Sequence, residues 1–182
     1  MILKIKGKVR MDKKNKYKHK HRIEEVDRLK ILSESLGKDV DLHAVAVATN
    51  LYRAAQSLRI VMERDVLSAH KLSWTAFSLL YDVWVWGPME TKELAASSGV
   101  TTATISTITN TLERKGLCER SADPRDRRRV SISLTKKGEQ VIKELYPKFH
   151  QGEKKLVHSM EVSEQERLAE QLRYIIQNIN NV

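Results

Sequence analysis

Two short helical segments followed at once by a patterned hairpin constrain the fold of this chain more than any other feature. The stretch TKELAASSG begins at Thr91, which we expect to cap the first segment, and ends at Gly99. The stretch TTATISTITNTLERKG then ends at Gly116. Two short helices joined by a glycine-containing turn are typical of a helix-turn-helix. We expect apolar residues of both segments to share one core: Leu94, Val100, Ile105, Ile108 and Leu112.

Two alternating runs, LCERS at 117–121 and VSISL at 130–134, follow the second segment. Alternation places Val130, Ile132 and Leu134 on one face of a strand. The runs therefore predict a β-hairpin with a long loop. That loop, DPRDRRR, holds six charged side chains in the seven positions 123–129. A hairpin placed directly after a helix-turn-helix is the arrangement of a winged helix.

Helical periodicity precedes this region. A weak apolar pattern covers Ile23 to Leu36, and a longer one extends from a capping Asp41 to about Leu67. An unusually aromatic helix is expected from Ser73 to Trp86, where Gly-Pro ends it.

Helical periodicity also follows the hairpin. One helix is expected to start on a capping Thr135, and Pro147 and Gly152 should kink or fray it. The sequence SEQE predicts a capping box of Ser163 and Glu166 at the start of the last helix. The chain is therefore expected to be mainly α-helical with a small β-hairpin wing.

The order of these motifs and the residues in them resemble those of the MarR-type transcriptional regulators. The resemblance rests on KELAASSGVTTATISTITNTLERKGLCER followed by DPRDRRRVSISLTKKG, and it extends over about residues 41–180. It implies an α+β winged helix with dimerisation helices from both termini. The expected parts are a basic arm (1–22), N-terminal dimerisation helices (23–72), the winged helix-turn-helix (73–134) and C-terminal dimerisation helices (135–182).

The charged tip of the wing suits contact with DNA. Arginine has a planar guanidinium that is less strongly hydrated than an ammonium group, so it can lie on phosphates or enter a narrow minor groove. The resemblance implies that Arg128 enters the minor groove and that Asp126 holds the wing. Arg125, Arg127 and Arg129 are expected at phosphates or solvent. The alternative is an ordinary solvated loop.

The second helix of the helix-turn-helix is rich in hydroxyl groups, with seven Ser or Thr residues in the eleven positions 101–111. Short hydroxyl side chains let a helix approach the groove floor, where they bond to phosphates or base edges. Asn110 could recognise adenine through two hydrogen bonds. The expected DNA contacts of this helix are Thr102, Ala103, Thr104, Ser106, Thr107 and Asn110.

The last helix carries a one-sided apolar stripe that must be covered. The resemblance implies that a second copy of the chain covers it, placing two recognition helices on a palindromic site. Packing within the same chain is the alternative. The predicted dimer residues are Leu168, Leu172, Ile175, Ile176 and Ile179.

A small aromatic effector is a further expectation from the resemblance, bound in a cleft beside the aromatic helix. The residues expected to line it are Tyr52, His70, Trp74 and Tyr81. The alternative is that these aromatic residues are simply core.

The net charge of +10 is concentrated at the N-terminus. Residues 1–22 hold ten Lys or Arg and one Asp, whereas the other 160 residues hold 23 basic and 22 acidic side chains. The arm could contact DNA phosphates, or be a solvated tail.

The single cysteine, Cys118, is expected to be a buried apolar residue in a cytoplasmic protein, so an oxidant-sensing role is not expected.

Other classes of function have less support from the residues. No glycine-rich phosphate loop, Cys/His metal spacing or nucleophile motif is present, so we expect no enzyme, metal or cofactor. No apolar run is long enough for a membrane span, and none is expected. The interpretation we adopt is a homodimeric repressor that binds double-stranded DNA and is released by an effector. Its rivals are an architectural DNA-binding protein without effector control and a dimeric module that binds acidic protein.

Overall fold

The computed structural model describes residues 26–31, 33–35, 40–122 and 130–181. The segments 1–25 and 123–129, which include the basic arm and the tip of the wing, lie outside the described residues. The elements are α2 (Leu42–Asp65), a 3-10 turn η1 (Leu67–His70), α3 (Trp74–Trp86), β1 (Met89–Glu90), α4 (Thr91–Ser98), α5 (Thr102–Arg114), β2 (Cys118–Ala122), β3 (Val130–Leu134), α6 (Lys136–Leu156) and α7 (Val162–Asn180). Residues 26–31 and 33–35 are also helical.

The chain divides into two compact units, Met1–Ser57 and Leu58–Val182. The described part of the first unit is helical and includes the first two thirds of α2, which begins at the cap Asp41. Asp41 Oδ1 accepts hydrogen bonds from the backbone amides of His43 (2.9 Å) and Ala44 (3.0 Å), as expected for a cap. These two amides lower the pKa of the Asp41 carboxyl. No described residue of α2 is buried except Met62, which lies in the second unit.

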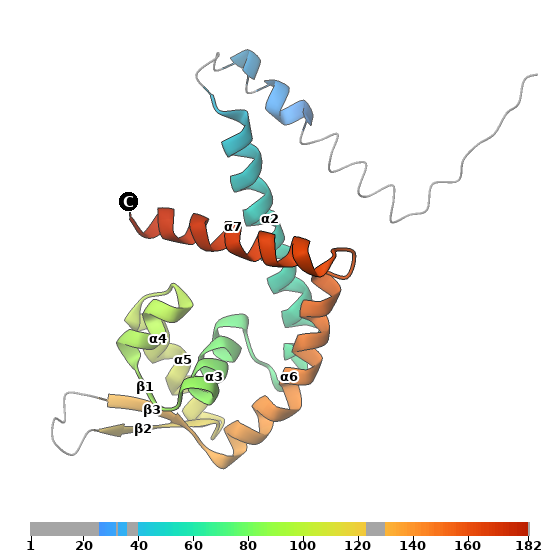
Figure 1. The fold of residues 1–182 in the computed structure, drawn as a ribbon. Helices are drawn as coiled ribbons and strands as arrows, with labels where there is room; N and C mark the ends of the chain where they lie inside the picture. The colour runs from blue at the N-terminus through green and yellow to red at the C-terminus, as the bar shows by residue number, and fades with distance from the viewer. Residues whose placement is uncertain (1–25, 32, 36–39, 123–129, 182) are drawn as a thin grey trace, which may run out of the picture. The chain divides into compact units, whose positions relative to one another are not determined.

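The second unit contains the core and the predicted winged helix (Figure 1). The helix-turn-helix is α4 and α5, joined by Gly99 in the left-handed conformation (φ 62°). Its core residues Leu94, Ile105 and Leu112 have no exposed surface. They pack in one cluster with the buried faces of α3, β3 and α6. The fold is thus mainly helical with a small antiparallel sheet, as the sequence pattern predicts.

The sheet has one strand more than expected, in the order β1-β3-β2. β2 and β3 form the predicted hairpin, in which Cys118 is opposite Leu134 and Arg120 is opposite Ile132. The two-residue β1 pairs with the other edge of β3, with Met89 opposite Ile132. Ile132 is fully buried where the three strands meet.

Two predicted helix caps are wrong by one or two residues. α4 is capped by Glu90 rather than Thr91, because Glu90 and Glu93 form a reciprocal capping box. α7 is likewise capped by a pair of glutamates, Glu161 and Glu164, instead of Ser163 and Glu166. In each case a glutamate pair satisfies free amides in the first turn, so Thr91 and Ser163 become the first and the second residue of their helices.

Pro147 and Gly152 were expected to kink or fray the helix after the hairpin, but neither ends it, because α6 continues through both to Leu156. Pro147 is exposed, so water can satisfy the carbonyl group left without a helical partner. Gly152 faces Met62, whose sulfur and methyl group occupy the space that a Cβ would need.

Within the described ranges, no helix is both long and apolar enough to cross a membrane.

Candidate nucleic-acid interface

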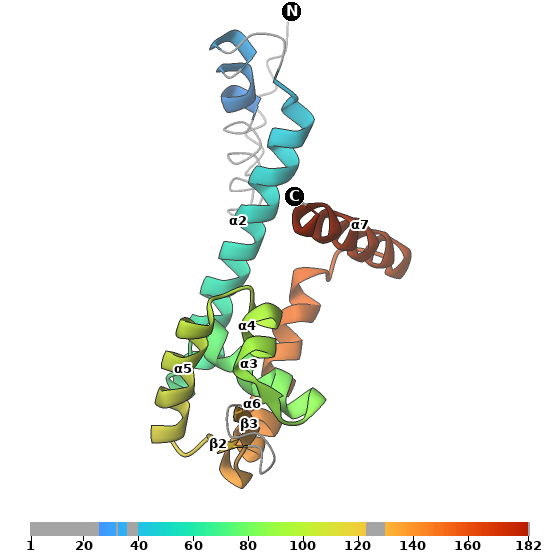
Figure 2. The same ribbon diagram turned by 90° about the vertical axis from the view of Figure 1, so that its left-hand side faces the viewer.

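The outer face of α5 is uncovered in the second unit. Thr102, Ala103, Thr104, Thr107 and Asn110 are exposed. Figure 2 shows α5 on the outer side of the helices of the winged helix. Ser106, also predicted as a DNA contact, is half-buried. All six predicted positions therefore reach the surface of one helix, although Ser106 does so only in part.

Thr109 belongs to the same run of hydroxyl residues but points into the core. It has no exposed surface, and its Oγ1 donates to the carbonyl oxygen of Ile105 at 2.8 Å. That bond satisfies the hydroxyl proton, which makes burial of a threonine acceptable. Thr101 is the cap of α5 and accepts from the amide of Thr104 at 3.2 Å.

The exposed threonines further along α5 also bond to the helix backbone. Thr107 Oγ1 donates to the carbonyl oxygen of Ala103 at 3.1 Å, and Thr111 Oγ1 donates to that of Thr107 at 3.2 Å. Each hydroxyl proton is thereby engaged. The oxygen of Thr111 also accepts from Arg114 Nη2 at 3.2 Å, so it is the oxygen of Thr107 that remains available as an acceptor. This face therefore offers hydrogen-bond acceptors and small apolar contacts, the latter of the kind that a thymine methyl group accepts.

Arg120, on the first wing strand, joins the wing to α5. Its Nη1 donates to Oδ1 of Asn110 at 2.8 Å and also contacts the Glu113 carboxylate. Its Nη2 donates to the carbonyl oxygen of Ser106 at 3.1 Å, and its backbone amide donates to Glu113 Oε1 at 3.1 Å. The side chains of Arg120 and Glu113 are 29% and 30% exposed. One guanidinium thus fixes the strand against three successive turns of the helix.

This contact restricts what Asn110 can do. Recognition of adenine through two hydrogen bonds needs both the oxygen and the nitrogen of the amide. In this arrangement Arg120 occupies one of the two lone pairs of Oδ1, while the Nδ2 group remains available to donate outwards. We did not anticipate the role of Arg120 from the sequence, although the Arg after Gly-Leu was visible as part of the motif.

The strands of the wing are described up to Ala122 and again from Val130. The hydroxyl groups of Ser121 and Ser131 lie 3.2 Å apart across the pair, on its exposed side. The predicted tip contacts lie outside the described residues: Arg125, Asp126, Arg127, Arg128 and Arg129. Their roles remain predictions.

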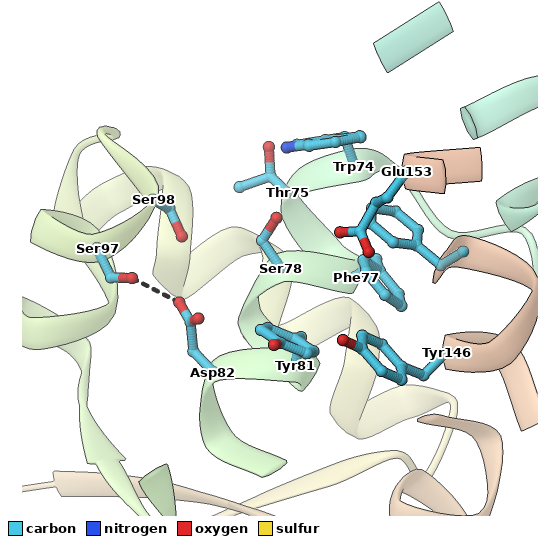
Figure 3. Close-up of a pocket in the computed structure, with 11 residues that line it drawn as sticks. Trp74, Thr75, Phe77, Ser78, Tyr81, Asp82, Ser97, Ser98, Tyr146 and Glu153 are labelled. Atoms are coloured by element: carbon cyan, nitrogen blue, oxygen red, sulfur yellow. Dashed lines mark hydrogen bonds between the residues drawn. The ribbon is translucent and has the colours of Figure 1, made fainter. Parts of the chain in front are cut away.

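A cavity of about 310 Å³ lies between α3, α4 and α6 (Figure 3). Trp74 and Tyr81, two of the four predicted effector contacts, line it. Tyr52 is 66% exposed in the other unit, and His70 is not among the lining residues. His70 instead lies 3.9 Å from Glu144, and its carbonyl oxygen accepts from Lys115. The lining residues are Trp74, Thr75, Phe77, Ser78, Tyr81, Asp82, Ser97, Ser98, Tyr146, Phe149 and Glu153.

Aromatic rings form one wall of this cavity. Phe77 and Phe149 stack with their centroids 4.2 Å apart, and Trp74 packs on Phe149 at 5.4 Å. Tyr81 stacks on Tyr146 at 5.4 Å. Phe77 and Phe149 are buried, whereas Trp74 and Tyr81 are half-buried. The aromatic helix therefore serves both the core and the cavity, and the two interpretations of it do not exclude each other.

Polar groups occupy the opposite side. Ser97 Oγ on α4 donates to Asp82 Oδ2 on α3 at 2.6 Å, as the dashed line in Figure 3 marks. Ser98 Oγ is buried and has no hydrogen-bond partner in the described part of the chain. Burial, a hydrogen bond with Tyr146 and the charges of nearby carboxylates raise the pKa of Tyr81.

The predicted dimer stripe on α7 stays largely exposed among the described residues. No residue of α7 is buried. Leu168, Ile176 and Ile179 are 39%, 57% and 65% exposed, and Leu172 and Ile175 are half-buried. α2 also exposes large apolar side chains, among them Val47, Tyr52 and Ile60.

Comparison with known proteins agrees with this geometry. The model of the MarR family matches residues 72–130. The HTH-type transcriptional regulator YwaE of Bacillus subtilis is 49% identical over 165 residues, which cover 89% of this chain and 96% of that protein. A second regulator of Bacillus subtilis, YkoM, is 29% identical over 103 residues, or 55% of this chain and 67% of its own length.

Solved structures share the fold at lower identity. A mutant MarR from E. coli complexed with operator DNA superimposes with a TM-score of 0.67 at 18% identity, covering 76% of this chain and 99% of that one. BpsR of Bordetella bronchiseptica, whose DNA binding is described as regulated by 6-hydroxynicotinic acid, gives 0.66 at 23% identity, covering 71% and 98%. The helix-turn-helix with its wing, the family match and the 49% identical relative lead to one assignment. This chain belongs to the MarR family of winged helix-turn-helix transcriptional regulators.

Proposed function

We propose that this regulator binds a palindromic operator as a homodimer, represses transcription there, and leaves the DNA when a small aromatic effector binds. The observation that carries the proposal is the exposed face of α5, fixed to the first wing strand by Arg120. A helix with short polar side chains can lie close to the floor of the major groove. A fixed strand then directs the wing toward the flanking backbone.

The DNA contacts of the proposal are those predicted for α5 and for the wing tip. Thr102, Ala103, Thr104 and Thr107 supply acceptors and methyl groups, and Asn110 supplies a donor. Arg125, Arg127 and Arg129 would contact phosphates, and Arg128 would enter the minor groove while Asp126 holds the loop. The E. coli MarR complex with operator DNA supports this use of the fold. A DNA-binding regulator of this kind would act in the cytoplasm.

The homodimer would form through the exposed stripe of α7 together with the terminal helices. Ile176 and Ile179 are more than half exposed, and each large aliphatic side chain removed from water contributes about 1.5–3 kcal/mol. A symmetric dimer presents two copies of α5, and successive major grooves on one side of DNA are about 34–36 Å apart. The operator would therefore be an inverted repeat.

The effector would occupy the cavity between α3, α4 and α6. Its aromatic wall suits a planar ligand, and its volume of about 310 Å³ is at the small end of the range for ligand sites. Two proteins of the same fold support ligand control: BpsR, whose DNA binding is regulated by 6-hydroxynicotinic acid, and PcaV of Streptomyces coelicolor, which was solved in complex with its natural ligand. The hydrogen bond between Ser97 and Asp82 links α4 to α3 at the edge of the cavity. A ligand that changes this bond would therefore change the position of a helix of the helix-turn-helix.

An architectural DNA-binding protein is the alternative that must be separated from this function. The discriminating measurement is the ratio of affinities for a selected site and for unrelated DNA at the same salt concentration. A regulator should show a ratio of about 10³ or more. A ratio near one, with a steep salt dependence, would favour binding through charge alone.

A further inference from the structure

We propose that the cavity between α3, α4 and α6 takes a cationic aromatic molecule, such as an aromatic quaternary amine, rather than an aromatic acid. This inference rests on the proposed role of the cavity as an effector site, and it specifies the chemical class of the effector. It comes from the charges and rings of the lining residues.

The formal charges in the lining all have one sign. Asp82 and Glu153 contribute carboxylates, and none of the eleven lining residues is Lys or Arg. The only ion pair of Glu153 in the described part of the chain is with His150, at 3.0 Å between Oε2 and Nδ1. Asp82 has a hydrogen bond from neutral Ser97 and no ion pair among the described residues. A cation would therefore meet two carboxylates that no lysine or arginine neutralises.

Figure 3 shows the two carboxylates on different sides of the ring cluster, Asp82 toward α4 and Glu153 on α6. The rings of Phe77, Tyr81 and Tyr146 line the same cavity as the two carboxylates. The faces of aromatic rings carry partial negative charge and attract ammonium groups within about 6 Å of the ring centroid. Rings and carboxylates thus favour the same ligand charge.

An aromatic acid would have no cationic partner here. Its carboxylate would enter a partly desolvated site beside two groups of the same charge, which is unfavourable because Coulomb repulsion grows as water is excluded. The direction of the Tyr81 pKa agrees, since the charges of Glu153 and Asp82 both contribute to raising it. Hydroxyl groups of Thr75, Ser78 and Ser98 could still bond to polar substituents of the ligand.

The position of Asp82 connects ligand charge to DNA binding. Asp82 accepts from Ser97 at the end of α4, the first helix of the helix-turn-helix. A cation held at Asp82 would lie beside this 2.6 Å hydrogen bond and would draw negative charge away from its acceptor, which would weaken one link between α3 and α4. Because α4 and α5 share one core, a shift of α4 would also displace the outer face of α5.

The test uses the full-length protein and three probes that each carry one benzene ring, the first two of the same shape. These are benzyltrimethylammonium, its neutral isostere neopentylbenzene, and the anion benzoate. Binding is followed by calorimetry and by tryptophan fluorescence, to which Trp74 in the cavity wall contributes. Ionic strength is held constant with sodium chloride. We expect the cation to bind about tenfold or more tightly than either other probe, the effect of one or two favourable charge contacts.

Charge-neutralising variants locate the site. Glu153→Gln and Asp82→Asn should each reduce affinity for the cation by about three- to tenfold and leave affinity for the neutral isostere unchanged. Glu139→Gln, on the same helix but outside the cavity, is the matched control and should change neither affinity. Circular dichroism and melting temperature verify that each variant is folded.

The outcomes separate this inference from the proposed function. Equal or tighter binding of benzoate or neopentylbenzene, or no binding of the cation, would overturn the cationic class while leaving DNA recognition untouched. An effect of Glu139→Gln equal to that of Glu153→Gln would also overturn it. Selective binding of the cation that leaves operator affinity unaltered would support the ligand class and reject the effector role.

Discussion

Arg120 donates from Nη1 to Oδ1 of Asn110 at 2.8 Å, and this bond connects the first wing strand to the outer face of α5. The same guanidinium contacts Glu113 and the carbonyl oxygen of Ser106. The bond therefore affects both the position of the wing strand and the hydrogen-bonding groups that Asn110 can offer to DNA. It holds the first wing strand against the recognition helix, and it occupies one lone pair of Asn110 Oδ1 while the Nδ2 group stays available as a donor.

Replacing Asn110 with Asp tests the second property. Asn110→Asp keeps an oxygen for Arg120 but removes the free NH₂ group, so the fold should persist while one base preference is lost. Discrimination at one position in each half-site should fall by about 1–3 kcal/mol, the worth of one good base contact. The measurement is the affinity for operators varied singly at every position.

Gln140→Glu, an exposed change on α6 that adds the same charge, is the control for general repulsion from phosphates. It should lower all affinities uniformly or not at all. If Asn110→Asp behaves in the same uniform way, Asn110 makes no base contact and our account of its amide is wrong.

Arg120→Lys tests the first property. A lysine keeps the positive charge but cannot reproduce the planar set of donors that contacts Asn110, Ser106 and Glu113 together. We expect the free energy of unfolding to drop by about 1.5–3 kcal/mol, the scale of a hydrogen bond to a charged group. DNA affinity should also fall. Urea denaturation and operator binding are the measurements.

The control for Arg120→Lys is Lys143→Ala, which removes an exposed ion pair with Glu139. Exposed pairs contribute little, so its effect should stay within about 0.5 kcal/mol. Equal effects of the two changes would mean that Arg120 is no more than an ordinary surface charge.

Cys118 gives the protein a predictable response to alkaline pH. Burial, together with the charge of Glu113, raises the pKa of the thiol from 9.0 to about 11. Between these values the folded protein keeps a proton that the unfolded chain releases, so the free energy of unfolding should fall as pH rises from about 9 to about 11. Cys118→Val should show a smaller fall in urea denaturation series at about pH 8.5 and about pH 10.5.

The same burial should protect the thiol in native protein. Iodoacetamide at about pH 8 should modify Cys118 only after denaturation, because the thiol is 2% exposed and neutral. Rapid alkylation of the native protein, or loss of DNA binding on peroxide treatment through this residue, would show that Cys118 is a sensor after all.

The α7 stripe should control assembly. Ile176 is 57% exposed in the single chain, so Ile176→Asp should leave the second unit folded while preventing a dimer. Combined with Leu172→Asp, it should give a monomer with greatly reduced operator affinity, measured by light scattering and DNA binding. Gln177→Asp, on the opposite face of the helix, should remain dimeric. A doubly substituted protein that still dimerises and binds DNA would place the interface elsewhere.

The three consecutive arginines of the wing tip should not be equivalent. Arg128→Ala should cost about 1–3 kcal/mol of DNA binding with folding and dimerisation intact, because the resemblance assigns this position to the minor groove. Arg127→Ala and Arg129→Ala, compared at the same salt concentration, should each cost less. Three equal and small losses would mean that the tip contributes only diffuse charge.

Local signals in the sequence were sufficient for most helix boundaries. Thr135 caps α6, as predicted, and Ser73, the expected start of the aromatic helix, is the cap of α3. Each hydroxyl accepts from an amide three residues later. The caps of α4 and α7 were missed because glutamate pairs formed the capping boxes beside the expected hydroxyl residues. Which of several neighbouring residues caps a helix depends on competition between their side chains for the same amides, and the sequence pattern does not show which one prevails.

Contacts between distant segments were harder to predict. β1 is only two residues long and exists because β3 offers it a free edge about forty residues later. The bond from Arg120 to Asn110 requires the packing of β2 against α5. The cavity combines residues of three helices, so Asp82, Ser97 and Glu153 carried no signal that would group them, whereas Trp74 and Tyr81 stood out by aromatic clustering.

The central claim, sequence-specific recognition by two copies of α5, is tested most directly by selection of bound duplexes from a random DNA pool with the purified full-length protein. The account predicts enrichment of an inverted repeat whose half-sites are centred about 10–10.5 base pairs apart, or a multiple of this spacing. Recovery of single, unpaired half-sites, or of duplexes with no common sequence, would contradict it.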